Sequence, residues 1–407
     1  MTRTKNQRRT VRAAVALAGA ALLALPSAAV ASAGTPSTEQ AGPAAKNVIL
    51  VIGDGMSDTQ ILASRYLDRG RDEPLAMETV PHRARAATFS ADDLVTDSAA
   101  AASSMGSGSL VENGSLNITP EGTNAMGDTL GVLAKDAGKS VGLISTRDIA
   151  NATPAGFGSA VPDRGQQSEI AGQYLDNELD VLLGGGEMFF LPEGTSGTHC
   201  DAGEADRGDG RDLFADYEAA GYTVARDRDE MQAADGDKLL GIFECKDMSF
   251  DRERAESEPS IAEMTDAALA ALQGNEQGFF LMVEGGMIDP AAERNDGANA
   301  MGDTIALDAA VERALAFAQG RDDTLVVVTA DHEAGGMALV FEDRAEETFE
   351  TADGRTMSIA WATSPGHTGA PVPVRATGPG SEQLDGWVGT EHLRDLYGVL
   401  RTAQFGS

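Results

Sequence analysis

Short apolar runs that end in polar residues recur along this 407-residue chain and alternate with longer helical patterns. The runs cover residues 47–52, 140–144, 279–283 and 324–329. In other stretches, residues 260–273 and 298–319, apolar side chains recur at three- and four-residue spacing, as on one face of a helix. This alternation is typical of βαβ units, so the sequence predicts an α/β fold around a large, mainly parallel sheet.

Three of the four apolar runs lead directly into a carboxylate, namely Asp54, Glu284 and Asp331. In open α/β sheets, ligands bind beyond the carboxyl ends of the strands. The three carboxylates are therefore predicted to converge on one site, although the strands that carry them lie far apart in the sequence.

The first 33 residues have the features of a signal peptide. Five basic residues precede an apolar run at residues 13–25, and small residues offer a cleavage site after Ala31 or Ala33. The run is too short to span a membrane, so we expect a secreted or periplasmic protein without a membrane anchor. Residues 34–45 are predicted to be a flexible mature N-terminus, and residues 46–407 a single domain with insertions.

The net charge limits the possible partners, and the cysteine content limits the possible disulfides. The formal net charge of −33 argues against nucleic acid as a partner, because binding it requires a basic face. The acidic surface has two explanations that stay open: adaptation to a saline habitat, or solubility combined with a GC-rich genome. The only two cysteines, Cys200 and Cys245, are predicted to form a structural disulfide in an exported protein.

Two of the five histidines stand in contexts that suit a metal site. His332 follows Asp331 at the end of an apolar run, and His367 lies in a Gly-His-Thr-Gly loop. The other three, His82, His199 and His392, are interpreted as surface or packing residues.

Together these motifs resemble the alkaline phosphatase family. The matching runs, in the order of the family, are residues 51–56 (VIGDGM), 95–100 (VTDSAA), 152–154 (ATP) with Arg164, 283–289 (VEGGMID), 329–333 (TADHE) and 366–369 (GHTG). The resemblance covers about residues 46–397 and implies a three-layer α/β/α sandwich. It also implies an enzyme that hydrolyses small phosphate monoesters, and a homodimer.

The resemblance assigns a role to each matching residue. Ser98 would attack phosphorus, and Arg164 would hold two phosphate oxygens. The first zinc would be held by Asp289 and His367, the second zinc by Asp54, Asp331 and His332, and a magnesium by Asp54, Thr153 and Glu284.

These residue types suit phosphoryl transfer. A serine hydroxyl is a weak nucleophile until it is deprotonated, and zinc favours the alkoxide without a neighbouring base. The planar guanidinium of Arg164 can donate two parallel hydrogen bonds to a phosphate. Magnesium prefers oxygen ligands, which Asp54, Thr153 and Glu284 supply.

Glu293 departs from the family pattern at the first zinc site, where a second histidine is usual. Its position four residues after Asp289 places it one helical turn further on the same face. Glu293 either coordinates the ion, giving an oxygen-rich and less zinc-selective site, or points away and leaves the site weak. We favour coordination and expect weaker zinc binding there, or replacement of zinc by a harder ion. Asn151, Pro290 and Ala334 are lesser departures, and Asn151 is expected to act on the magnesium only through the outer shell.

Two other functions are compatible with parts of the sequence. A related phosphodiesterase or sulfatase is disfavoured, because the chain has Arg164 and lacks the Cys-x-Pro-x-Arg setting of sulfatases. A catalytically inactive phosphate- or cation-binding protein is suggested by Glu293 and the acidic surface, but Ser98 and the other ligands are retained.

Overall fold

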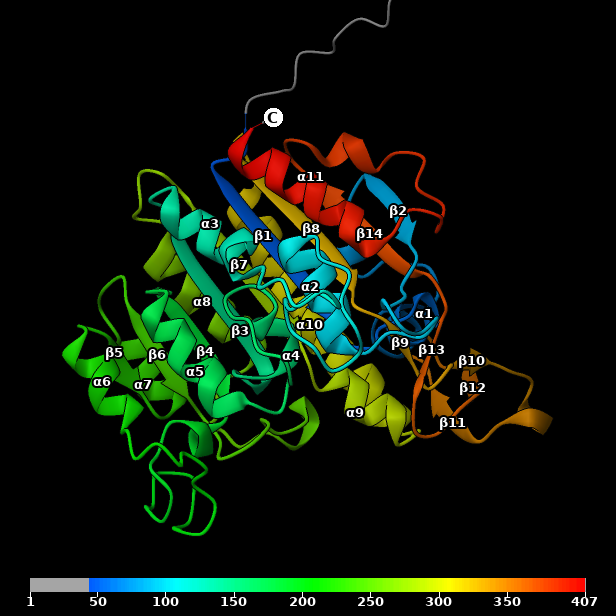
Figure 1. Cartoon of the computed structure of the whole chain (residues 1–407). Coiled ribbons are helices and arrows are strands. Elements are labelled where there is room, and N and C mark those ends of the chain that lie inside the picture. The colour runs from blue at the N-terminus through cyan, green and yellow to red at the C-terminus, as the bar shows by residue number, and fades with distance from the viewer. Residues whose placement is uncertain (1–43, 407) are drawn as a thin grey trace, which may run out of the picture. The chain divides into compact units, whose positions relative to one another are not determined.

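The computed structural model describes residues 44–406, which are built around a nine-stranded sheet (Figure 1). The predicted signal peptide and residues 34–43 of the predicted flexible segment lie outside the described residues. In order across the sheet, the strands are β2 (His82–Ala86), β14 (Val372–Thr377), β8 (Thr324–Ala330), β1 (Asn47–Gly53), β7 (Phe279–Gly285), β3 (Ser140–Asp148), β4 (Val181–Gly185), β6 (Leu239–Ile242) and β5 (Thr223–Ala225).

The sheet is mainly parallel, as predicted. Only β14 is antiparallel, to β8 on one side and to the edge strand β2 on the other. The four predicted runs are β1, β3, β7 and β8, which lie next to one another in the order β8-β1-β7-β3. Strands β1, β7 and β8 are buried along their whole length, which explains why they read as continuous apolar runs rather than alternating ones.

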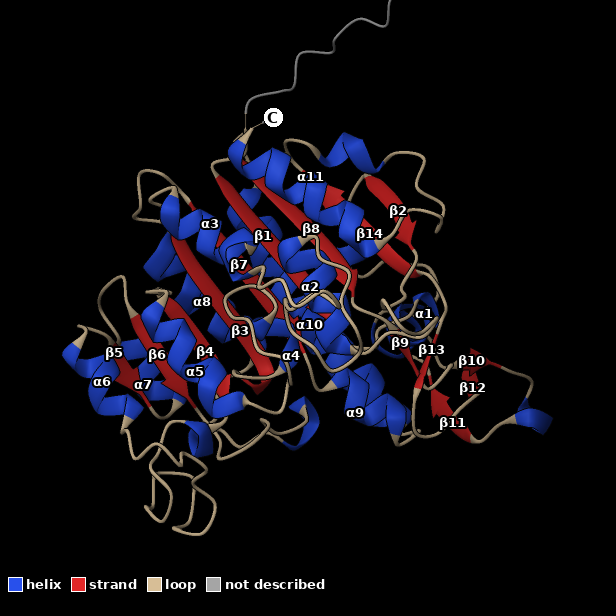
Figure 2. Ribbon diagram, in the orientation of Figure 1, coloured by secondary structure: helices blue, strands red, loops and turns tan. Residues whose placement is uncertain are grey.

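Helices cover both faces of the sheet (Figure 2). The α-helices are α1 (Asp58–Asp68), α2 (Ser98–Ser107), α3 (Leu130–Asp136), α4 (Ala152–Ala155), α5 (Gln167–Asp176), α6 (Leu213–Ala219), α7 (Arg228–Ala233), α8 (Ile261–Leu272), α9 (Ile288–Glu293), α10 (Gly297–Ala318) and α11 (Leu393–Phe405). Helices α2, α3 and α11 pack on one face, and α8 and α10 on the other, so the predicted three-layer α/β/α sandwich is confirmed. The two predicted helices correspond to α8 and α10.

Two small sheets and a disulfide complete the described structure. Strands β10 (Ala338–Leu339), β12 (Thr356–Ala360) and β11 (Glu347–Glu350) form one sheet, and β13 (His367–Thr368) pairs with β9 (Glu333–Ala334) in the other. The predicted bridge between Cys200 and Cys245 is present, with Cα atoms 4.9 Å apart.

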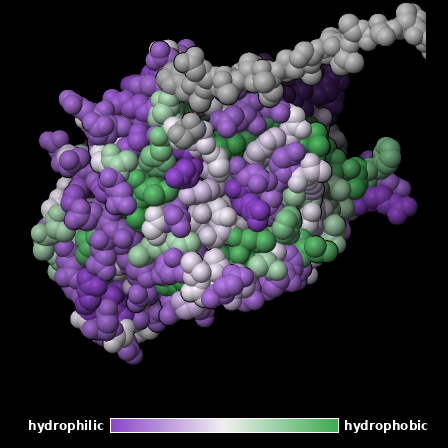
Figure 3. Space-filling view, turned by 45° about the horizontal axis from the view of Figure 1, so that its top comes forward, coloured by the Kyte–Doolittle hydropathy of each residue, from purple (hydrophilic) through white to green (hydrophobic). Residues whose placement is uncertain are grey.

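Figure 3 shows one face of the molecule, on which polar side chains predominate and apolar ones form small patches. Among the described residues, Leu94, Phe341 and Val388 are large apolar side chains that are strongly exposed. Within residues 44–406, no helix has the length and apolar character needed to cross a membrane.

Candidate active site

Ser98 is the first residue of α2, and the residue before it fixes the start of the helix. The carboxylate of Asp97 accepts hydrogen bonds from the backbone N–H groups of Ala100, at 2.9 Å, and Gly114, at 3.0 Å. An aspartate that caps a helix in this way satisfies N–H groups that have no partner within the helix. Ser98 is therefore held at the positive end of the helix dipole, where an anion is stabilised.

Small residues let α2 lie deep in the molecule. All ten of its residues are buried, and four consecutive alanines follow Ser98. A Cβ atom at Gly106 would lie 2.1 Å from the carbonyl oxygen of Gly156, so the backbones approach too closely for a larger residue. A larger residue at position 106 would therefore force α2, and Ser98 with it, away from the site.

The three carboxylates predicted to converge do so at the carboxyl ends of β1, β7 and β8. Glu284 lies beside Ile52 in the parallel ladder, Asp54 follows β1, and Asp331 follows β8. The Gly55 N–H donates to Asp331 Oδ1 at 3.0 Å, which ties the two strand ends together. Gly55 has φ of 71°, and a Cβ atom there would lie 2.8 Å from that of Ala334, so this turn requires glycine.

His332 forms the centre of one candidate metal group. Its Nε2 atom lies 3.3 Å from Asp54 Oδ1, 3.2 Å from Asp331 Oδ2 and 3.2 Å from Ser98 Oγ. Burial lowers the pKa of His332 well below its usual value, so the ring is neutral at neutral pH. Four ligands at about 2.0–2.1 Å from a tetrahedral zinc are about 3.3 Å apart, and the three separations fit that arrangement.

A second candidate group contains Asp289, Glu293 and His367. His367 Nε2 lies 3.5 Å from Asp289 Oδ1 and 3.7 Å from Glu293 Oε1. Its other ring nitrogen, Nδ1, is 2.9 Å from the carbonyl oxygen of Thr96 and donates to it, so in the neutral form of the ring Nε2 carries no proton. A bare nitrogen and two carboxylate oxygens then face one another, as ligands of a cation do. The rings of His332 and His367 stack 3.6 Å apart, so the two groups are adjacent.

A third group contains Asp54, Glu284 and Thr153. Ser145 Oγ donates to Glu284 Oε2, while Glu284 Oε1 and Asp54 Oδ1 are buried without a hydrogen-bond donor among the described residues. The Thr153 hydroxyl is likewise buried without a hydrogen-bond partner among the described residues, although it lies near enough to Glu284 to lower the pKa of that carboxyl. These are oxygen ligands only, which suits magnesium.

Burial makes these carboxylates costly to ionise when no cation is bound. Desolvation raises the pKa of Glu284 and of Asp289 to about 7, and raises those of Asp331 and, strongly, Asp54. Neighbouring carboxylates raise the pKa of Asp54 further. Buried charges of one sign require compensating ions, so the residues present fit a cluster of divalent cations.

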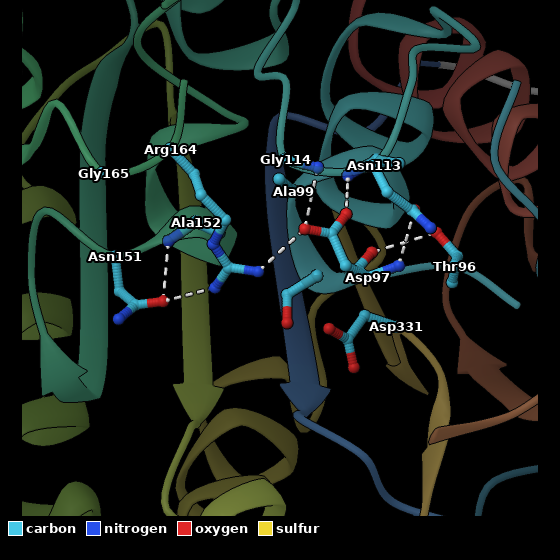
Figure 4. Close-up of polar contacts among 12 residues, drawn as sticks. Thr96, Asp97, Ala99, Asn113, Gly114, Asn151, Ala152, Arg164, Gly165 and Asp331 are labelled. Carbon is cyan, nitrogen blue, oxygen red and sulfur yellow. Dashed lines mark hydrogen bonds and ion pairs between the residues drawn. The ribbon is translucent and has the colours of Figure 1, made fainter. Parts of the chain in front are cut away.

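Arg164 lies between two acceptors at the edge of the site (Figure 4). Its Nη1 atom donates to Asp97 Oδ2 at 3.0 Å, and its Nη2 atom donates to Asn151 Oδ1 at 3.1 Å. The guanidinium remains partly exposed and can donate further hydrogen bonds to an incoming anion.

The structure brings the residues predicted for each metal together and keeps the other three histidines away. Within the described residues, His82 pairs with Asp385, His199 contacts the carbonyl of Arg226, and His392 caps α11. Sequence reasoning gave no role to Asp97, although an aspartate directly before a helix is a capping signal that could have identified it. The sequence predicts that Asn151 acts on the magnesium only through the outer shell, and in the structure its Oδ1 atom accepts a hydrogen bond from Arg164 at 3.1 Å.

Sequence comparison with known proteins identifies the same family that the motifs resemble. A sequence model of the alkaline phosphatase family matches residues 45–355. The streptomycin-6-phosphate phosphatase of Streptomyces griseus is 35% identical, over 95% of this chain and 96% of the relative. The alkaline phosphatase of Escherichia coli K12 is 30% identical, over 88% of this chain and 86% of the relative.

Solved structures agree with the sequence relatives. The alkaline phosphatase of Thermus thermophilus superposes with a TM-score of 0.77 and 27% identity, over 90% of this chain and 92% of that one. The enzyme of the Antarctic bacterium TAB5 gives 0.74 and 25%, over 89% and 98% of the two chains. A mutant of the TAB5 enzyme has been solved with Mg bound in a site named M3.

Proposed function

Because the chain belongs to the alkaline phosphatase family and is a phosphatase, we propose that it hydrolyses phosphate monoesters through a phosphoserine intermediate on Ser98. The observation that carries this proposal is the position of the Ser98 hydroxyl. It lies at the start of α2 and 3.2 Å from His332 Nε2, within the group that also contains Asp54 and Asp331.

The family normally uses metal ions, and we propose two zinc ions and one magnesium ion here. Asp289, Glu293 and His367 would hold the first zinc, Asp54, Asp331 and His332 the second, and Asp54, Thr153 and Glu284 the magnesium. Bound there, the ions would supply Lewis acidity that favours the serine alkoxide and stabilises the departing oxygen.

The chain's own residues bind and orient the phosphoryl group. The free N–H groups at the start of α2 and the guanidinium of Arg164 stabilise negative charge on its oxygens. Ser98 Oγ forms a bond to phosphorus as the bond to the alcohol oxygen breaks, and the alcohol leaves with a proton. Water then attacks phosphorus, the bond to Ser98 Oγ breaks, a proton from that water returns to the serine oxygen, and inorganic phosphate is released.

Comparing a monoester, a diester and a sulfate ester of one chromogenic alcohol tests the proposed reaction class. We expect the monoester to be hydrolysed at least about a hundredfold faster than the other two, because Arg164 is placed to bind a phosphoryl group with free oxygens. Equal or faster hydrolysis of the diester or sulfate would contradict the proposal.

We propose that Glu293 ligates the first metal. Its Oε1 atom lies 3.7 Å from His367 Nε2, beside Asp289, which supports this placement. An oxygen in place of a nitrogen ligand favours harder ions over zinc.

Glu293→His is therefore expected to tighten zinc binding at the first site about tenfold. Zinc content per chain, measured after dialysis against a zinc-buffering chelator, would report the change, with the exposed Glu276→His as the matched control. Two tightly held zinc ions per chain in the unaltered protein would show that Glu293 does not weaken the site.

We further propose that residues 46–407 act as one catalytic domain of an exported enzyme that forms a homodimer. One relative is named for a phosphorylated small molecule, which supports small phosphate monoesters as substrates.

A further inference from the structure

The side chain of Arg164 is held from two sides, and the two sides are fixed differently (Figure 4). On one side Asp97 is anchored by backbone N–H groups, which leave its carboxylate no freedom to turn. On the other side the partner is the side-chain amide of Asn151. An amide can present either an acceptor or a donor, and only its oxygen can accept from Arg164.

The orientation of the Asn151 amide is set by a second carboxylate, Asp148, at the end of β3. Asn151 Nδ2 donates to Asp148 Oδ2 at 2.7 Å, and this directs Asn151 Oδ1 towards Arg164. The Ala152 N–H, at 2.8 Å from the same oxygen, supports this orientation. Flipping the amide would place its Nδ2 donor against the Nη2 donor of Arg164 and its oxygen against the Asp148 carboxylate.

Asp148 is itself held firmly. It is buried, and its other oxygen, Oδ1, accepts from Gln167 Nε2 at 2.8 Å. Burial, together with Asp247, raises its pKa to about 6, so above neutral pH the group is ionised and can only accept hydrogen bonds. The hydrogen-bond direction is therefore fixed along the whole path from Gln167 through Asp148 and Asn151 to Arg164.

We infer that Asp148 is a positioning residue for phosphate binding, which acts through the Asn151 amide to hold the Arg164 guanidinium in place. The inference rests on the proposed function, in which Arg164 binds the phosphoryl group. No part of it requires Asp148 to touch substrate or metal.

The test is a double-mutant cycle on the full-length, metal-loaded protein. Asp148→Asn removes the charge and allows the Asn151 amide to flip, so inorganic phosphate should inhibit about fivefold more weakly. KM for a chromogenic monoester should rise similarly, and kcat should change less than KM. In an Arg164→Ala background, Asp148→Asn should have no further effect on phosphate affinity. The exposed Asp176→Asn is the matched control, with no expected effect.

A rescue variant separates positioning from mere structural support. In Asp148→Asn combined with Asn151→Asp, the amide at 148 donates to the carboxylate at 151, which still accepts from Arg164. Phosphate affinity should return to within about twofold of the original value. If Asp148→Asn does not fold, Asp148→Ser takes its place in the same cycle.

The inference is overturned if Asp148→Asn leaves phosphate affinity unchanged, or if its effect is undiminished in the Arg164→Ala background. Arg164→Ala alone tests the proposed function. If that change does not weaken phosphate binding, the proposed role of Arg164 is wrong and the inference fails with it.

Discussion

Ser98→Ala is expected to lower kcat for phosphate monoesters by at least about 1000-fold. The variant keeps the metal ligands and Arg164, so phosphate can still bind, but no oxygen is left to form the phosphoserine. Rates on a chromogenic monoester would measure the loss. Acid quenching of a reaction with radiolabelled phosphate would show whether labelled serine forms.

Ser104→Ala offers a matched control for this prediction. Ser104 lies on the same helix, and within residues 44–406 its hydroxyl donates only to the carbonyl oxygen of Ser109, at 3.4 Å. We expect this variant to keep its activity within a few-fold and to trap phosphoserine normally. If Ser98→Ala retained more than about a tenth of the original rate, the covalent route through Ser98 would be wrong.

Removal of divalent metal is expected to abolish activity and to lower the midpoint of thermal unfolding by on the order of 10 °C. The loss of thermal stability should be larger at alkaline pH. The folded-state pKa values of Glu284 and Asp289 are raised to about 7 in the metal-free protein, and that of Asp54 is raised strongly. Because the folded state then binds more protons than the unfolded state, these groups reduce stability as the pH rises.

The lowered pKa of His332 has the opposite effect, because it makes the free energy of unfolding rise with pH. This rise is nearly complete above the ordinary histidine pKa of about 6.5. Scans at about pH 6.5 and 8.5, with and without chelator, therefore report mainly the upper part of the carboxylate titration, that of Glu284 and Asp289 near pH 7 and the strongly raised one of Asp54. The metal-free form should lose more stability between the two pH values than the metal-loaded form, and zinc with magnesium should restore it. An unfolding midpoint that does not respond to chelator would show that the site holds no structural metal.

The sequence predicts the centre of this fold better than its edges. Strands β1, β3, β7 and β8 were recognisable because a strand buried on both faces must be apolar throughout. Strands β14 and the edge strand β2 were not predicted, because both are short and mix charged with apolar residues, which leaves no clear period.

The candidate site was also predicted only in part. Asp54, Glu284 and Asp331 were predicted to meet because the topology of a parallel sheet brings strand ends to one edge. The contacts of Arg164 with Asp97 and Asn151 join side chains from separate loops, and hydrogen bonds of this kind leave no periodic pattern in the sequence. The side-chain direction of Glu293 likewise depends on its neighbours in space, beyond its spacing from Asp289.

The position of β1 between β7 and β8 also determines when the molecule can become active during folding. This strand, residues 47–53, is made early, yet its two partners are residues 279–285 and 324–330, and His367 follows later still. Pairings between distant segments form slowly, because a long loop must close before any contact is gained. The nascent chain therefore carries its first strand without a partner for most of its synthesis and needs protection from aggregation during that time. The proposed metal site can form only once the chain is nearly complete, because a chain that ends before residue 367 lacks His367.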